Sequence, residues 1–443
     1  MVQTRFSTPQ SAPTFTPLPS RRAALQSILG AGAAGALAGS LGCATAVGTG
    51  TVGNAAPPSA SASPAATANP SARPGLRLIG QSTLAHKLQF KGTTVGGLSG
   101  LDYDREKGIY YAISDDRSDL EPARFYTLKL DITANSVAPA QILSVTTLQR
   151  PDGSAYPSRR AAKAGEEVCD PESIRLRVAT QTLYWTSEGD AKLNLPPFIR
   201  EMHLDGRYSS QVPLPSMFVA ASQDGRGEST QSTRGESTQG TRGESIQGTR
   251  GVRDNLGFEG LAFAPSGDTF WAAMEAPLVE DGPVPAVGKV GGACRITQFH
   301  AHSSQPIRQI AYYPDAIPFA PVPAGAWADN GISEVWMASE TGMLVLERAY
   351  AVGVGNSLRL YWIDVEDCSD VMAKPTLSQG AFKPAGKTLL LDFAQVGLVP
   401  LDNTEGMTRG PTLPNGNPTL VFVSDDNFNP RQATQFVAFE WVP

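Results

Sequence analysis

Short stretches of alternating apolar and polar residues, separated by turn-forming residues, make up most of the chain after residue 74. An alternation with a period of two predicts half-buried β-strands. The 44 Gly and 35 Pro favour many turns over long helices. The pattern therefore predicts an all-β domain. The clearest alternating stretches are residues 124–131, 199–204, 295–300, 359–364 and 434–441.

Five segments also share a longer pattern. Each begins with a short polar or acidic motif, which we call a knot, and continues with an apolar run, a turn and a closing acidic residue. The knot and closing residues are Ser99 and Asp115, Glu172 and Glu188, Glu259 and Glu275, Glu334 and Glu347, and Glu405 and Asp425. Three pairs are 16 residues apart, and the others are 13 and 20 apart. An even offset across a turn is typical of a two-stranded hairpin, which brings both residues to the same end of the sheet.

The spacing of the knots indicates how these units assemble. Successive knots lie 73, 87, 75 and 71 residues apart, and each unit is too short to bury its own apolar face. Units of this kind stack radially, so we predict a β-propeller of five to six blades, five of which are visible as repeats. Residues 76–91 are candidates for part of a sixth blade. Alternatively, a strand at 76–80 is expected to close the ring against 436–441.

The octapeptide Arg-Gly-Glu-Ser-Thr-Gln-Ser-Thr begins at Arg226 and recurs with small changes up to residue 251. It contains almost no apolar residue that could be buried. We therefore predict that residues 226–251 form a low-complexity surface loop that interrupts the domain.

The N-terminal region has the features of a targeting segment. Residues 20–26 are similar to a twin-arginine export motif, and Ala44-Thr45-Ala46 fits a cleavage site. The alternative is a lipobox at 40–43, with a lipid attached to Cys43. We predict an export signal at 1–46, a flexible linker rich in Ala, Ser and Pro at 47–74, and a globular domain at 75–443. The mature protein is expected to be periplasmic or secreted and to have no transmembrane span.

Charge and cysteine content restrict the possible partners. The net charge is −6, and residues 1–72 carry three Arg and no acid, which leaves −9 for the remainder. An acidic domain is a poor candidate for binding nucleic acid, but it suits cations. Cys169, Cys294 and Cys368 do not have zinc-site spacing. They are expected to form one disulfide at most, or to be small buried residues.

The knots resemble the phytase-like family, which is described as having esterase-like activity of phytase. The resemblance extends over 76–443 apart from the octapeptide loop. It implies a propeller-like β domain and a hydrolytic activity on phosphate esters. The matching motifs lie at residues 96–104, 113–117, 170–174, 258–261, 346–348, 404–407 and 424–427.

Hydrolysis of a phosphate ester at an acidic site requires a metal, because carboxylates alone repel phosphate. Bound Ca²⁺ would reverse the local charge and lower the pKa of its water. Arg117 and Arg348 are candidates for binding the phosphate of a small substrate. The candidate catalytic residues are Glu172, Glu259, Glu405 and Asp115. The candidate metal ligands are Asp170, Glu172, Glu188, Glu259, Glu275, Glu405 and Asp425.

Two other functions are compatible with the same residues. In the first, the propeller binds a ligand without catalysis. Its acidic side chains accept hydrogen bonds from backbone N–H groups of the next blade and so hold the ring together. In the second, a carboxylesterase uses Ser99 or Ser333, although no G-x-S-x-G motif is present. The aromatic residues Trp185, Trp271, Trp336 and Trp362 are predicted to form inter-blade core.

Overall fold

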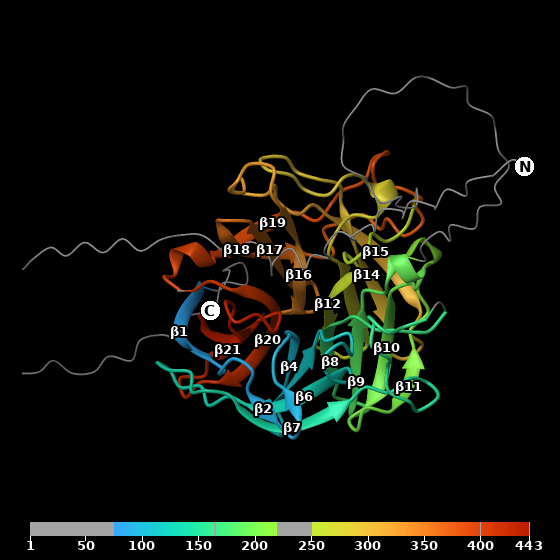
Figure 1. The fold of residues 1–443 in the computed structure, drawn as a ribbon. Helices are drawn as coiled ribbons and strands as arrows, with labels where there is room; N and C mark the ends of the chain where they lie inside the picture. The colour runs from blue at the N-terminus through green and yellow to red at the C-terminus, as the bar shows by residue number, and fades with distance from the viewer. Residues whose placement is uncertain (1–74, 164, 219–249, 399, 443) are drawn as a thin grey trace, which may run out of the picture.

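The computed structural model describes residues 75–163, 165–218, 250–398 and 400–442. The predicted export signal at 1–46, the linker at 47–74 and nearly all of the predicted loop at 226–251 lie outside these residues. The described residues contain five four-stranded antiparallel sheets arranged as the blades of a propeller (Figure 1). The predicted fold is confirmed, with five blades.

Each blade is built from strands that are nearly consecutive in the chain. Blade 1 contains β4 (Leu98–Asp104), β5 (Ile109–Ser114), β6 (Arg124–Lys129) and β7 (Gln141–Thr147). Blade 2 contains β8 (Pro171–Arg177), β9 (Thr182–Ser187), β10 (Phe198–His203) and β11 (Tyr208–Gln211). Blade 3 contains β12 (Phe258–Phe263), β13 (Thr269–Met274), β14 (Cys294–His300) and β15 (Pro306–Tyr312).

Blade 4 contains β16 (Ala328–Met337), β17 (Gly342–Ala351), β18 (Gly355–Asp364) and β19 (Lys387–Asp392). Blade 5 contains β20 (Asn403–Thr412), β21 (Pro418–Asp425), β22 (Gln435–Val442) and β1 (Gly75–Thr83). A small ribbon of β2 (Gln89–Phe90) and β3 (Thr93–Thr94) precedes blade 1. The outermost strands β7, β11, β15 and β19 were not identified from the sequence pattern.

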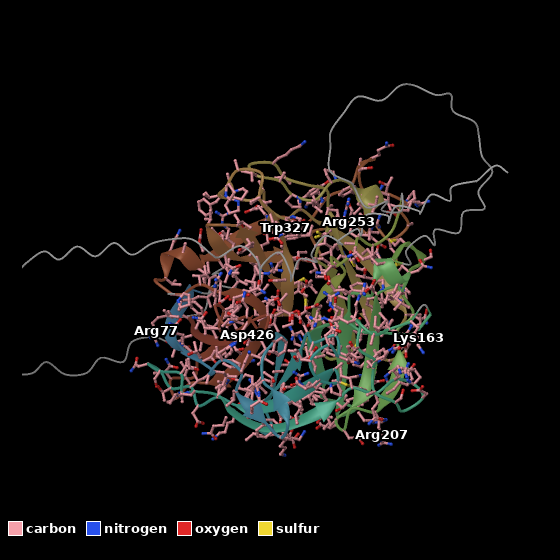
Figure 2. The ribbon with its side chains drawn as sticks, viewed as in Figure 1. Arg77, Lys163, Arg207, Arg253, Trp327 and Asp426 are labelled. Atoms are coloured by element: carbon pink, nitrogen blue, oxygen red, sulfur yellow. The ribbon has the colours of Figure 1, made fainter. Side chains whose placement is uncertain are left out.

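The ring is closed by strands from opposite ends of the described chain. β1 pairs with β22 in blade 5, with Leu76 opposite Trp441 and Leu78 opposite Phe439. Figure 1 shows β1 beside the C-terminal strands, and Figure 2 shows Arg77 at the edge of the molecule. Arg77 Nε donates to Glu440 Oε2 at 2.7 Å. The predicted closure is therefore confirmed, and residues 76–91 supply β1 and β2 in place of a sixth blade.

Alternate residues of each strand fill the two neighbouring gaps between blades. On β5, Tyr110 and Ala112 pack with Val421 of blade 5, whereas Tyr111 packs with Trp185 of blade 2. The period of two thus buries both faces of every blade. Trp185 and Trp271 are buried as predicted, but Trp336 and Trp362 are only partly buried.

The five inner strands, β4, β8, β12, β16 and β20, surround the axis, and each packs against the next. Every inner strand has a β-bulge, where its pairing with the second strand shifts. The bulge lies near the first residues of β4, β8, β12 and β20 and in the middle of β16. A bulge turns a side chain out of the regular alternation. The bulged residues include Ser99, Glu172, Glu259, Ser333 and Glu405.

Three described cysteines, Cys169, Cys294 and Cys368, have free thiols, and Cys368 is partly exposed. The possible disulfide is therefore absent among these three residues, and the alternative of small buried residues holds for Cys169 and Cys294. In the portion of the chain covered by the structure, no helix is both long enough and apolar enough to cross a membrane.

Candidate functional site

The bulges and the ends of the second strands meet at one end of the ring, around a cavity that we call the acidic mouth. The bulges of inner strands supply Glu172, Glu259 and Glu405. From the second strands, Asp115 and Glu188 directly follow β5 and β9, Asp425 ends β21, and Arg348 lies within β17. Polar side chains form its lining: Asp115, Arg117, Asp170, Glu172, Glu188, Asn255, Glu259, Arg348, Asn403, Glu405, Asp425 and Asn427.

The acidic mouth contains all but one of the candidate residues selected from the sequence. The exception is Glu275, which does not line the cavity. Its carboxylate nevertheless lies near those of Glu188 and Glu259, with one oxygen of each residue within 4.8 Å of the others. The residues selected from the repeat pattern thus line one cavity, and their functional roles stay predictions.

In blade 4, the pairing of Glu334 with Glu347 proposed from the sequence is wrong. Ile332 lies opposite Glu347, and Glu334 lies opposite Leu346, so the bulged residue is Ser333. The residue equivalent to Asp115 and Glu188 is then Arg348. The fourth blade consequently contributes Arg348 to the lining of the site, where the other blades contribute mostly acids.

Glu347 instead belongs to a buried cluster outside the mouth. It accepts hydrogen bonds from Tyr312 Oη and Lys387 Nζ, both at 2.6 Å, and from Asp315 N at 2.9 Å. Burial and the adjacent Glu347 carboxylate raise the pKa of Tyr312 well above its usual value. The cluster ties blade 3 to blade 4.

Glu334 and Arg175 close the axis of the ring below the mouth. Their side chains form a buried ion pair, with Arg175 Nη2 2.7 Å from Glu334 Oε2. Burial raises the pKa of Glu334 to about 7, against the opposing effect of Arg175. Arg175 also donates to backbone carbonyls of four inner strands, those of Leu101, Ile174, Val335 and Met407.

Glu334 extends this network to the fifth inner strand, because its Oε1 accepts from Leu261 N of β12 at 3.0 Å. Ser173 Oγ on β8 donates to Glu334 Oε2 at 3.0 Å. The ion pair thus joins all five blades, and its side chains occupy the axis between the inner strands.

Ser99 links two acids of the mouth. Its Oγ lies 2.6 Å from Glu172 Oε2 and 2.8 Å from Glu405 Oε2. A hydroxyl has one hydrogen and can donate in only one of these contacts. The other contact is a hydrogen bond only when its carboxyl group is protonated, so the arrangement is suited to hold a proton between Glu172 and Ser99.

The electrostatic surroundings of the mouth favour a protonated carboxyl group at Glu172. Burial is the main cause that raises the pKa of Glu172 well above 4.5, followed by repulsion from Glu259, Asp115, Glu188 and Asp170. Burial likewise raises the pKa of Glu259, followed by repulsion from Glu275, Glu188 and Glu405, and only Arg348 opposes the rise. So many carboxylates remain ionised together only if a cation compensates them.

Two arginines, Arg117 and Arg348, are the positively charged residues in the lining of the acidic mouth. Arg117 Nε forms an ion pair with Asp170 Oδ1 at 3.0 Å, and its Nη2 donates to Asn255 at 2.9 Å. Arg348 Nη2 lies 3.4 Å from both Glu275 Oε1 and Glu405 Oε1. Both guanidinium groups border the cavity, where a phosphate could bind.

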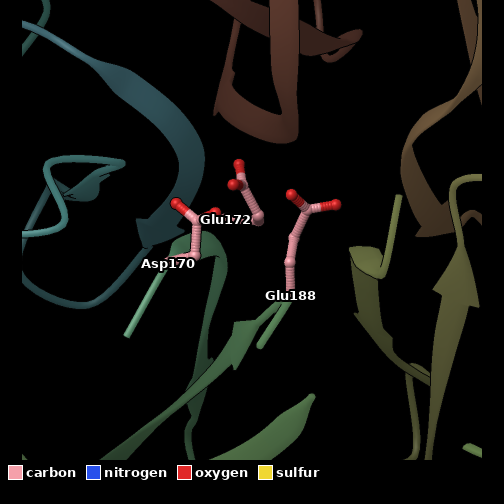
Figure 3. A group of neighbouring side chains, drawn as sticks. All are labelled: Asp170, Glu172 and Glu188. Atoms are coloured by element: carbon pink, nitrogen blue, oxygen red, sulfur yellow. The ribbon is translucent and has the colours of Figure 1, made fainter. Parts of the chain in front are cut away.

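The donor set fits a hard divalent cation. Two groups of three acids, Asp170, Glu172 and Glu188, and Glu188, Glu259 and Glu275, have oxygens within 4.8 Å of one another. Two oxygens bound to one Ca²⁺ lie at most about 5 Å apart, so this spacing suits calcium. Figure 3 shows the first group with its carboxyl groups near one another. None of the four His of the chain lines the mouth.

Sequence reasoning missed three amide residues of the mouth. Asn403 Nδ2 donates to Glu405 Oε1 at 3.0 Å, and its position two residues before Glu405 on β20 was a usable signal. Asn427 lies within the motif at 424–427. Asn255 had no signal, because it lies in a loop before β12, with a positive φ of 56°.

The solved structures that match are distant in sequence. A Dos1 propeller is 6% identical, with 79% of this chain and 69% of that chain covered and a TM-score of 0.30. A putative 6-phosphogluconolactonase from Bacteroides uniformis is 12% identical, with 76% and 80% covered and a TM-score of 0.29. U3-55K is 8% identical, with 82% and 100% covered and a TM-score of 0.32. No curated protein matches the sequence.

The family comparison is more specific. The model of the family described as "Phytase-like: Esterase-like activity of phytase" matches residues 93–428. The match spans most of the described ring and includes every residue that lines the acidic mouth. This chain therefore belongs to the phytase-like family.

Proposed function

We propose that this protein is an exported, calcium-assisted hydrolase of small phosphate esters, with its active site in the acidic mouth. The observation that carries the proposal is the convergence of carboxylates from several blades on one cavity that also has two arginines. Family membership supports hydrolysis of phosphate esters as the reaction class. Export rests on the predicted signal at residues 1–46.

The acids would hold the cation. Glu188 belongs to both groups of neighbouring carboxylates and is the natural ligand to share between two ions, with Asp170 and Glu172 on one side and Glu259 and Glu275 on the other. When bound, Ca²⁺ would neutralise the phosphate oxygens and lower the pKa of a bound water molecule.

The remaining residues would orient the substrate and supply a proton to its leaving group. Arg117 and Arg348 bind phosphate oxygens through their N–H groups. Glu172, which can hold a proton at Oε2 beside Ser99 Oγ, donates it to the departing alcohol. Water attacks phosphorus and the P–O ester bond breaks. The leaving oxygen takes the proton of Glu172 and departs as the neutral alcohol, and a proton of the attacking water stays on the phosphate product or returns to Glu172.

The test is phosphate release by protein purified without residues 1–74. Turnover of 4-nitrophenyl phosphate or its diester is expected with calcium and is expected to be lost with a chelator. Arg348→Met should lower turnover by at least tenfold, because it removes a charged contact to phosphate. Absence of turnover over a panel of mono- and diesters, with and without calcium, would contradict the proposal.

A non-catalytic binding propeller is the second candidate, and specific contacts favour it. Glu188 Oε1 of blade 2 accepts from Gly257 N of blade 3 at 2.6 Å. Asp426 Oδ1 of blade 5 accepts from Gly97 N, next to blade 1, at 2.8 Å. If these contacts are the main task of the acids, neutral variants lose stability and calcium has no effect.

The serine carboxylesterase hypothesis is tested separately. Ser99 contacts Glu172 and Glu405, and no histidine lines the mouth to act as its base. Labelling by a fluorophosphonate that is lost in Ser99→Ala would support an esterase. Turnover that survives in this variant would exclude Ser99 as the nucleophile.

A further inference from the structure

A second cavity lies between blades 4 and 5, away from the acidic mouth. β20 runs from Glu405 in the mouth to Arg409 at this cavity, about 13 Å further along the strand. We call the cavity the tryptophan groove. Its lining consists of Trp336, Ala338, Arg409, Pro418, Thr419, Leu420 and Trp441.

Aromatic rings dominate the groove. The rings of Trp336 and Trp441 have centroids 6.2 Å apart and are inclined by 67°, and the ring centroid of Trp362, outside the lining, lies 6.5 Å from that of Trp441. All three indoles are only partly buried, unlike Trp185 and Trp271 in the inter-blade core. Partly exposed aromatic rings around a cavity provide a surface for another flat apolar group.

Arg409 is the one charged residue that lines the groove. Within the described chain, its Nε is buried without a hydrogen-bond partner, and no acid acts on it. Burial, followed by repulsion from Arg105, lowers the pKa of its guanidinium. Other buried arginines are compensated, as Arg124 is by Asp116 and Arg295 by Asp281. A half-buried cation without a counter-charge attracts an anion.

The hydrogen-bond donors that line the groove restrict the class of ligand that it can bind. Thr419 Oγ1 already donates its hydrogen to Pro411 O at 2.8 Å, which leaves the guanidinium of Arg409 and the indole N–H groups of Trp336 and Trp441 as the side-chain donors of the lining. A sugar would need several polar partners for its hydroxyl groups. One planar guanidinium surrounded by apolar walls matches one carboxylate attached to an apolar ring.

We propose that the tryptophan groove is a second binding site, separate from the acidic mouth, for a small aromatic carboxylate. The carboxylate binds the guanidinium of Arg409, and the aromatic ring packs against Trp336 and Trp441.

Isothermal titration of the full chain with 2-naphthoate tests this site, and 2-naphthamide serves as the neutral analogue. We expect saturable binding of the acid with a Kd below about 1 mM. The amide should bind at least tenfold more weakly. Arg409→Met keeps the apolar stem and should weaken binding of the acid at least tenfold, because the charged hydrogen bonds are lost.

Arg105→Met is the matched control, because it removes an exposed cation near Arg409 but outside the groove lining. It should change the Kd less than twofold. Ala338→Leu fills the groove without touching the charge and should also abolish binding, which keeps the test valid if Arg409→Met folds poorly. The proposal is overturned if the unaltered protein does not bind naphthoate, if acid and amide bind equally, or if the Ala338→Leu protein still binds.

Discussion

At the scale of single residues, a substitution of Glu259 best distinguishes the two candidate roles of the acids in the mouth, which are calcium binding and stabilisation of the ring. Four of the five main influences on the pKa of Glu259 raise it, namely burial and the neighbouring Glu275, Glu188 and Glu405. A carboxylate in these surroundings destabilises the cation-free protein when it ionises. If the same acid binds calcium, the cost is removed by the ion.

Glu259→Gln is therefore expected to raise the free energy of unfolding of the calcium-free protein at pH 8 by about 1 kcal/mol or more, because it removes a repelled charge. It should also reduce the stabilisation by calcium. Thermal unfolding with chelator and with calcium measures both effects.

Glu347→Gln is the matched control for this prediction. Glu347 is also buried, but it is paired with Lys387 away from the mouth. Its substitution should lower the free energy of unfolding by about 3 kcal/mol, leaving the response to calcium unchanged. If Glu259→Gln destabilises the protein as Glu347→Gln does, the ring-locking role of the acids is supported instead.

At the scale of elements, the repeated bulges explain the knots of the sequence. In three blades a glycine follows the bulged residue because the neighbouring inner strand is too close for a side chain. A Cβ on Gly100 would lie 2.6 Å from Glu172 O, and one on Gly260 would lie 2.9 Å from Val335 N. Blade 4 has Glu334 at this position, and its side chain meets Arg175 on the axis.

Arg175→Met is predicted to lower the free energy of unfolding by about 3–5 kcal/mol, because it leaves Glu334 buried without its partner and four backbone carbonyls without their donor. Adding Glu334→Leu should recover part of this loss. Urea unfolding of both single variants and the double variant measures the coupling. Additive losses would show that the pair is not coupled.

At the scale of the whole molecule, ring closure depends on β1. Removal of residues 1–83 takes away the outer strand of blade 5 and its pairing with β22, whereas removal of 1–74 leaves that strand in place. We predict that the shorter protein aggregates or unfolds at a temperature at least 10 °C lower. Thermal unfolding and size-exclusion chromatography compare the two truncations. Equal stability would show that β1 is dispensable for closure.

The pH dependence of stability also belongs to the whole ring. Glu172, Glu259 and Glu334 have pKa values above the unfolded value of 4.5, and that of Glu334 is about 7. The folded state therefore binds more protons than the unfolded state above pH 4.5. Its stability falls as the pH rises through the folded pKa values.

Without calcium, the melting temperature is expected to fall between pH 5 and pH 8, and calcium should raise it more at pH 8, where the ligands are ionised. Scanning calorimetry in chelator and in calcium measures this difference. A calcium effect that is equal at both pH values would contradict the assignment of the acids as ligands.

The sequence by itself determined the inner strands of the blades, the five-fold repeat and most charged residues of the acidic mouth. Alternation and turn residues are local properties, so residues such as Glu172 and Glu188 could be assigned to one end of a hairpin from their spacing alone. Family motifs added the order of the blades.

Only the tertiary structure decided the features that depend on register and on contacts between distant segments. A one-residue shift put Ser333 at the bulge in place of Glu334 and Arg348 in the mouth in place of Glu347, because a single bulge reverses which side chains face the axis. The Arg175–Glu334 pair and the tryptophan groove join residues more than 70 positions apart. Such neighbours are brought together by ring closure, which leaves no periodic signal in the chain.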